Sequence, residues 1–178
     1  LFAGDLVERK GLPYLLEAVA EPGLEHVRLV VAGSGDVRFW REQCKSLGID
    51  RRVVLLGWVK NELIHQILVD VDVMILPSRH EGLPVSVLEG LSAGVCVVAT
   101  PVGALPEVLK TEQDSLLLEE LSSHAIAQAL TRISNGEYRA SIAQSGLSTW
   151  TEKFDVKVTT PKLETIWKTT YANAKLSK

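Results

Sequence analysis

The 178-residue sequence has few cysteines, no long apolar run and no strong excess of charge of either sign. Its two cysteines, Cys44 and Cys96, are too few for a disulfide framework or a metal site, and they favour a reducing compartment. No apolar run approaches the roughly 18 residues of a membrane span, and no signal peptide is visible. The formal net charge of −3 gives no reason to expect nucleic-acid binding.

Several catalytic motifs are missing as well. The absence of G-x-S-x-G, H-E-x-x-H and P-loop patterns removes the usual hydrolase, zinc-protease and NTPase interpretations. A dinucleotide-dependent oxidoreductase is a distant alternative, because no G-x-G-x-x-G follows a predicted strand. The length suits one domain. Since the chain opens on Leu1 without a methionine, we expect it to be a piece of a longer protein.

The most informative stretch is a predicted strand, loop, helix and strand in the middle of the chain. Residues 73–76 and 95–99 are apolar runs without polar alternation, which is typical of parallel strands covered on both faces. Two carboxylates, Glu81 and Glu89, lie eight positions apart between these runs. Pro84 suits the first turn of the intervening helix, where its missing N–H is tolerated.

Alternating strand and helix patterns run through the rest of the chain. They predict further strands over 1–3, 27–32, 53–56 and 114–118, and helices over 12–20, 36–47, 61–69, 122–134, 137–150 and 161–175. Asn61 is the expected N-cap of its helix, and Gly48 a plausible C-cap. The expected fold is α/β: one domain with a Rossmann-like, doubly wound parallel sheet over about 1–118 and a helical tail over about 119–178.

Both glutamates stand out against this fold. Ligands of open α/β sheets bind beyond the carboxyl ends of the strands, which is where Glu81 is predicted to lie. Glu89 is expected on a packed helix face, and a carboxylate there needs a hydrogen-bonding partner. Its neighbours three and four positions away are small or apolar: Val85, Ser86, Ser92 and Ala93.

Residues 77–107 resemble the E-x7-E region of retaining, nucleotide-sugar-dependent glycosyltransferases of family 4 (group 1), which have the GT-B fold. The resemblance spans about 1–118 and, more weakly, the tail. It implies that this chain is the C-terminal, donor-binding domain and that the N-terminal, acceptor-binding domain is missing from it. The longer protein would be a hexosyltransferase that moves a sugar from a nucleoside diphosphate sugar to a hydroxyl acceptor with retention of configuration.

The first predicted donor contact is the segment from Gly4 to Gly11. A glycine after a strand and a lysine before a helix suit a pyrophosphate, although an isolated match would favour a solvated lysine. The family pattern is Gly-Arg-Leu-x-x-x-Lys-Gly, and this chain keeps Lys10 but has Asp5 where the arginine is expected. A carboxylate there would repel a pyrophosphate, and Arg9 could reach in instead.

The resemblance assigns roles to further residues. It implies that Glu89 accepts hydrogen bonds from the ribose hydroxyls, a task that suits a carboxylate because it can accept two at once. Glu81 and Lys10 are the expected catalytic residues, with Glu81 at the donor sugar. The complete set of expected donor-binding residues is Gly4, Lys10, Gly33, Gly35, Val59, Glu81, Gly82, Leu83, Val85 and Glu89. His80 is interpreted as a loop residue, and His26, His65 and His124 show no ligand spacing.

The resemblance also sets expectations about cofactors and partners. Neither a metal nor a cofactor is expected besides the nucleotide sugar, because basic residues and helix amides can stabilise the departing diphosphate. The acceptor would be a glycan or lipid in polysaccharide or glycolipid biosynthesis. The protein would be cytoplasmic, or peripheral at the inner face of a membrane, and the isolated piece inactive. The alternatives are a degenerate nucleotide-sugar binding or interaction module and a GT-B epimerase or phosphorylase relative.

Overall fold

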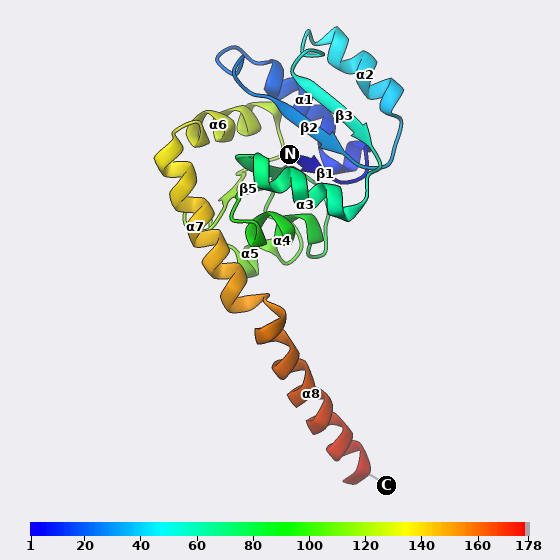
Figure 1. Cartoon of the computed structure of the whole chain (residues 1–178), viewed down its shortest axis with the longest axis vertical. Helices are drawn as coiled ribbons and strands as arrows, with labels where there is room; N and C mark the ends of the chain where they lie inside the picture. Colours follow the sequence, from blue (N-terminus) through cyan, green and yellow to red (C-terminus); the bar gives the residue numbers. More distant parts are fainter. Residues whose placement is uncertain (177–178) are drawn as a thin grey trace.

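The computed structural model describes residues 1–176, with side chains as far as Tyr171 (Figure 1). Within this part, six parallel strands form the centre of the molecule. They are β1 (Phe2–Ala3), β2 (Leu29–Ala32), β3 (Val53–Gly57), β4 (Val73–Leu76), β5 (Cys96–Ala99) and β6 (Leu116–Leu117). The ladders β1–β2–β3 and β4–β5–β6 are each parallel, and the pairing of β2 with β3 shifts register between Val31 and Ala32.

The two ladders join side by side at the first residue of the chain. The backbone nitrogen of Leu1 donates to the carbonyl of Val73 at 2.7 Å, and the carbonyl of Leu1 accepts from the nitrogen of Ile75 at 2.9 Å. Leu1 thus bonds to the residues on either side of Met74, which lies opposite it, and this is the hydrogen-bond pattern of two parallel strands. The strand order is therefore 3-2-1-4-5-6, that of a doubly wound sheet, with its topological switch point between β1 and β4.

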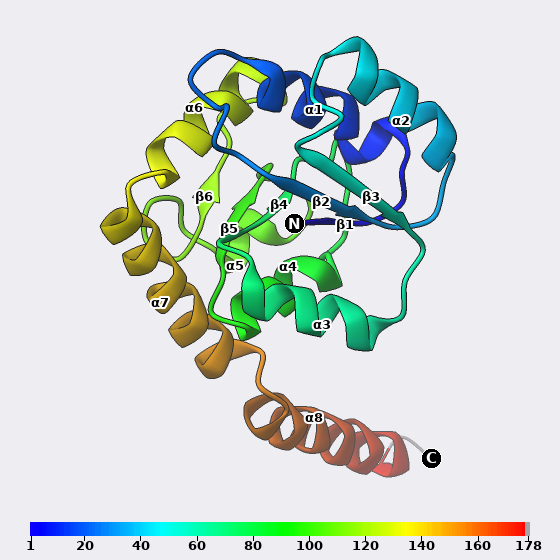
Figure 2. The same cartoon turned by 45° about the horizontal axis from the view of Figure 1, so that its top comes forward.

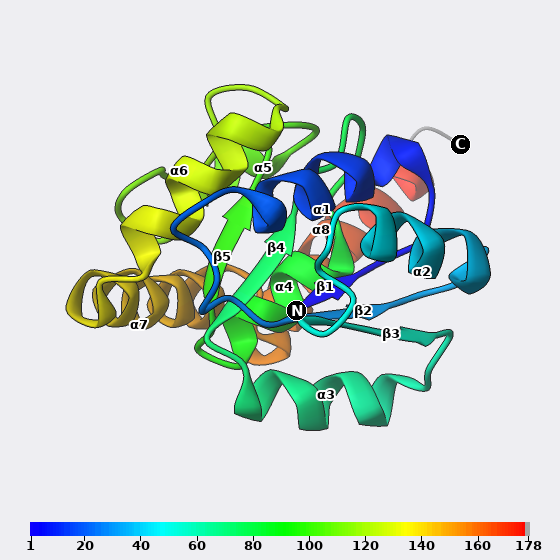
Figure 3. The ribbon, with the colours of Figure 1, turned by 90° about the horizontal axis from the view of Figure 1, so that it is seen from above.

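Helices cover both faces of this sheet (Figures 2 and 3). Helices α1, α2 and α6 lie on one side, and α3, α4 and α7 lie on the other. The final helix, α8, extends away from the body (Figure 1). The bounds are η1 (Glu8–Lys10, a 3-10 turn), α1 (Leu12–Ala20), α2 (Val37–Ser46), α3 (Asn61–Asp70), α4 (Val85–Ser92), α5 (Leu105–Val108), α6 (Ser123–Ile133), α7 (Gly136–Lys153) and α8 (Val156–Leu176).

Burial explains why the central strands are unbroken apolar runs in the sequence. All four residues of β5 are buried, as are Met74, Ile75 and Leu76 of β4, because helices pack against both faces of the central strands. Strand β3 lies at the edge of the sheet, and its Val54 and Leu56 are exposed. The predicted doubly wound parallel α/β fold with a helical tail is confirmed.

Three predicted details of helix ends are wrong. Lys60 occupies the N-cap of α3 instead of Asn61, and Pro84 is the N-cap of α4 rather than part of its first turn. Helix α8 begins at Val156, so Pro161 lies inside it. The earlier start follows from Asp155, whose side chain accepts a hydrogen bond from the nitrogen of Lys157 at 2.8 Å. Residues 177 and 178, at the end of the predicted tail, lie outside the described residues.

No helix within residues 1–176 combines the length and the apolar character that crossing a bilayer requires.

Candidate functional site

The loops that follow β1 and β4 meet at the switch point, on the carboxyl edge of the sheet. Gly11 has a φ of 77°, and a Cβ at this position would lie 1.8 Å from the carbonyl oxygen of Pro77. The nitrogen of Arg79 also donates to the carbonyl of Arg9 at 2.8 Å. The β1 loop can approach the β4 loop this closely only because residue 11 has no side chain.

This approach brings two predicted catalytic residues together. The Nζ atom of Lys10 lies 2.6 Å from Oε1 of Glu81, although the residues are 71 positions apart in the chain. Their side chains are only 14% and 10% exposed. Charge-assisted bonds of this kind are strong, and the loss of one partner would leave a largely buried charge uncompensated. The pair therefore fixes a cation and a carboxylate at the position where a ligand of this fold binds.

The amino end of α4 lies immediately beyond Glu81. Its first turn contains no acidic residue, and the side chain of its N-cap, Pro84, accepts no hydrogen bond. Neither a carboxylate of the first turn nor the side chain of the cap therefore satisfies the free N–H groups at this end. The helix dipole adds partial positive charge at this end, which suits an anionic ligand. Leu83 and Val85 are exposed beside it, and the carbonyl of Gly82 accepts from the nitrogen of Ala104 at 2.8 Å. Their donor contacts stay predictions.

Gly4, Gly33 and Gly35 lie at the same edge, where the loops after β1 and β2 touch. A Cβ on Gly33 would lie 1.7 Å from the carbonyl oxygen of Gly4. The nitrogen of Leu6 donates to the carbonyl of Ser34 at 2.7 Å and holds the two loops together. This contact by itself accounts for a glycine at position 33. Half-buried Val59 follows β3 at the same edge.

The structure gives Asp5 a partner. A guanidinium nitrogen of Arg9 lies 3.5 Å from Oδ2 of Asp5, four positions apart along the chain. Both side chains are more than half exposed, so the pair contributes little to stability. Its consequence is electrostatic: a cation accompanies the carboxylate that was expected to repel a pyrophosphate.

Glu89 has a partner of its own, which comes from another helix. Its Oε1 lies 3.6 Å from Nε2 of His65 on α3, and the two carry opposite charges when the imidazole is protonated. The side chain of Glu89 is 21% exposed and that of His65 is 63% exposed. Sequence reasoning missed His65, because its partner comes from another helix and no local spacing connects the two.

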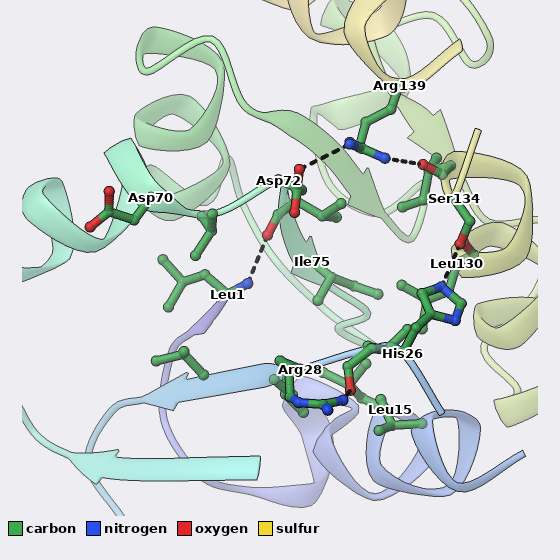
Figure 4. Close-up of a pocket in the computed structure, with 17 residues that line it drawn as sticks. Leu1, Leu15, His26, Arg28, Asp70, Asp72, Ile75, Leu130, Ser134 and Arg139 are labelled. Atoms are coloured by element: carbon green, nitrogen blue, oxygen red, sulfur yellow. Dashed lines mark hydrogen bonds and ion pairs between the residues drawn. The ribbon is translucent and has the colours of Figure 1, made fainter. Parts of the chain in front are cut away.

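A cavity of about 530 Å³ lies at the opposite edge of the sheet (Figure 4). Leu1, Leu29 and Val73 line it, so it opens at the amino ends of β1, β2 and β4. Arg139 reaches Asp72 across its rim at 3.0 Å. This cavity is at the edge opposite to the one where ligands of doubly wound sheets bind, which is beyond the carboxyl ends of the strands.

No group of three His, Cys, Asp or Glu side chains within the described residues is arranged to hold a metal ion.

Comparison with known proteins is consistent with the geometry. Residues 1–135 match the family described as glycosyl transferases group 1. The chain is 35% identical over 135 residues to the uncharacterized glycosyltransferase MJ1607 of Methanocaldococcus jannaschii. That alignment covers 75% of this chain but 35% of MJ1607, so the chain spans about a third of that relative's length.

Solved structures show the same fold. The C-terminal domain of the glycosyl transferase group 1 family protein LpcC from Francisella tularensis superimposes with a TM-score of 0.77 at 26% identity. The match covers 87% of this chain and 85% of that one. Anabaena Alr3699/HepE, crystallised with UDP and glucose, superimposes with a TM-score of 0.81 at 24% identity, over 94% of this chain and 48% of its own.

Proposed function

Because the chain belongs to the glycosyl transferases group 1, we propose that it is the donor-binding half of a retaining, family 4 enzyme. The longer protein then moves a hexosyl group from a nucleoside diphosphate sugar to a hydroxyl acceptor on a glycan or lipid. Its acceptor-binding half belongs to the part of the protein outside this chain. In this proposal the isolated chain binds nucleotide weakly and does not turn over.

The observation that carries the proposal is the Lys10–Glu81 pair at the switch point, beside the amino end of α4. We place the donor's diphosphate between the ammonium of Lys10 and the free amides of α4. An ammonium has three donors, so Lys10 can hold a phosphate oxygen and Glu81 together. A fixed cation and fixed dipoles stabilise the negative charge that develops on the departing diphosphate. Glu81, held by Lys10, is then available to contact the donor sugar.

The remaining donor contacts follow the same edge. Gly4, Gly33 and Gly35 offer bare backbone to the diphosphate, and the backbone at Val59 meets the base. Glu89 accepts hydrogen bonds from the ribose hydroxyls. The arrangement requires neither metal nor cofactor, because Lys10 and the helix amides supply the positive charge.

The test is calorimetric titration of the chain with UDP, GDP and ADP, each with and without EDTA. UDP is the first candidate, since it is present in the structure of HepE. We expect saturable binding to one nucleotide that EDTA does not change. Glu89→Ala should weaken it about tenfold or more, since hydrogen bonds to a charged group contribute about 1.5–3 kcal/mol.

Glu17→Ala is the matched control, because it removes an exposed glutamate from α1. It should bind as the unchanged chain does. If the folded chain binds none of the three nucleotides, or if Glu89→Ala binds as tightly as the unchanged chain, the proposal is wrong.

One observation favours a second candidate, a binding module with a weakened phosphate site. Asp5 places a negative charge at the phosphate edge, and Arg9 is already engaged with it. If the donor site is intact, Asp5→Arg should raise the affinity for the nucleoside diphosphate severalfold by removing this charge and freeing Arg9. An unchanged affinity would favour the binding module.

A further inference from the structure

We propose that His65 is a positioning residue that holds the Glu89 carboxylate in the orientation in which it receives the ribose hydroxyls. This inference rests on the proposed function, and it names a residue that neither the motif nor its spacing contains. His65 belongs to α3, the crossover helix between β3 and β4, whereas Glu89 belongs to α4. The two helices lie on the same face of the sheet (Figures 2 and 3).

The surroundings of Glu89 give the carboxylate few ways to be held. Its neighbours on α4 offer small or apolar side chains, and the hydroxyl of Ser92 is engaged with the backbone carbonyl of Glu89 rather than with its carboxylate. Within the described residues, the side chain that approaches the carboxylate is His65, whose Nε2 lies 3.6 Å from Oε1. This distance is just beyond that of a direct hydrogen bond, so a small movement of either side chain lets the imidazole N–H donate to the carboxylate.

The geometry leaves room for both partners of Glu89. His65 approaches Oε1, and a carboxylate has about four acceptor positions on its two oxygens. The other oxygen and the unused positions of Oε1 can accept two hydroxyls. A glutamate side chain loses considerable rotamer freedom when it is fixed, so a partner that restrains it before the ligand arrives lowers the entropy lost on binding.

The exposure of His65 makes the role testable. A side chain that is 63% exposed contributes little to folding, so its removal should leave the chain folded. A positioning role then predicts an effect confined to ligands that carry ribose hydroxyls.

The experiment measures the affinities of UDP and 2′,3′-dideoxy-UDP for the unchanged chain and for four variants. GDP or ADP and its dideoxy form replace them if the titration above selects that base. The variants are His65→Ala, His65→Gln, Glu89→Ala and Gln66→Ala. Gln keeps an N–H that can reach a carboxylate, and Gln66 is the exposed neighbour on the same helix.

We expect the unchanged chain to prefer the nucleotide with hydroxyls and Glu89→Ala to lose this preference. His65→Ala should weaken binding of the hydroxylated nucleotide about threefold to tenfold, as expected when one side chain must be immobilised at binding. The dideoxy nucleotide should bind to the His65→Ala variant with the same affinity as to the unchanged chain. His65→Gln should recover most of the preference, and Gln66→Ala should retain it fully.

The outcomes separate this inference from the proposed function. If Glu89→Ala loses the preference but His65→Ala keeps it, His65 does not position Glu89 and the proposed function stands. Equal weakening of both nucleotides by His65→Ala would also overturn the positioning role. If Glu89→Ala keeps the preference, the ribose assignment itself is wrong, and the inference falls with it.

Discussion

The Lys10–Glu81 pair provides a quantitative test of how the switch point is built. Lys10→Met removes the ammonium but keeps a side chain of similar length, so it leaves the Glu81 carboxylate, which is 10% exposed, without a cation. Breaking a buried ion pair in this way costs about 3–5 kcal/mol. Because both side chains keep some contact with water, we expect a smaller loss of about 2–3 kcal/mol in the free energy of unfolding.

Urea unfolding followed by circular dichroism measures the effect. With a denaturant slope of about 2 kcal/mol per molar, the midpoint should fall by about 1–1.5 M. The double variant Lys10→Met/Glu81→Gln removes both charges and should recover more than half of the loss, because no buried charge is left unpaired.

The chain contains a matched control in the pair Lys45–Glu42. Its Nζ–Oε1 distance is 3.0 Å, but its side chains are 55% and 59% exposed. Lys45→Met should therefore change the free energy of unfolding by less than about 0.5 kcal/mol. Equal losses in Lys10→Met and Lys45→Met would refute the argument from burial. Strictly additive losses in the Lys10→Met/Glu81→Gln cycle would refute the pairing.

Three further predictions concern the scaffold. In the same urea assay, Gly11→Ala should lower the free energy of unfolding by more than about 2 kcal/mol, because the added methyl would overlap the carbonyl of Pro77. Gly23→Ala is the control: Gly23 has a φ of 91° but open space around it, so the loss should be only about 1 kcal/mol. Asp36→Ala should lose about 1 kcal/mol, since the Asp36 side chain caps α2 by accepting from a backbone nitrogen at 2.9 Å, and an unchanged urea midpoint would contradict this. Burial raises the pKa of the Cys96 thiol from 9.0 to about 11, so the thiol should react slowly with DTNB at pH 8 until urea unfolds the chain. Between pH 9 and 11 the unfolded thiol loses its proton before the folded one does, so the free energy of unfolding should fall as pH rises, by about 1.4 kcal/mol for each unit of pKa difference. Cys96→Ala should remove this part of the pH dependence, and the same pH dependence in the variant and the unchanged chain would contradict the assignment.

Much of the fold follows from local patterns in the sequence. The helix over 12–20 and the strand over 73–76 have the bounds expected from the hydrophobic pattern. A buried helix face imposes a helical repeat of apolar residues, and a doubly covered strand imposes an unbroken apolar run. The same logic placed Glu81 at the carboxyl end of β4, where the fold binds ligands. Helix ends were less predictable, because several neighbouring residues can begin a helix. For α8 the sequence predicted a start at Pro161, but the helix begins at Val156, directly after Asp155.

The site was only partly readable from the sequence, because its contacts join segments that are distant along the chain. The sequence by itself determined the α/β class, the polar loop with Glu81, the positions of Lys10 and Glu89, and the presence of an acidic residue at position 5. Tertiary structure alone decided that Lys10 meets Glu81 across the switch point and that His65 faces Glu89. The physical reason is that periodicity records which face of an element is buried. The partner that each loop or helix face meets depends instead on strand order and on close backbone contacts such as the one between Gly11 and Pro77.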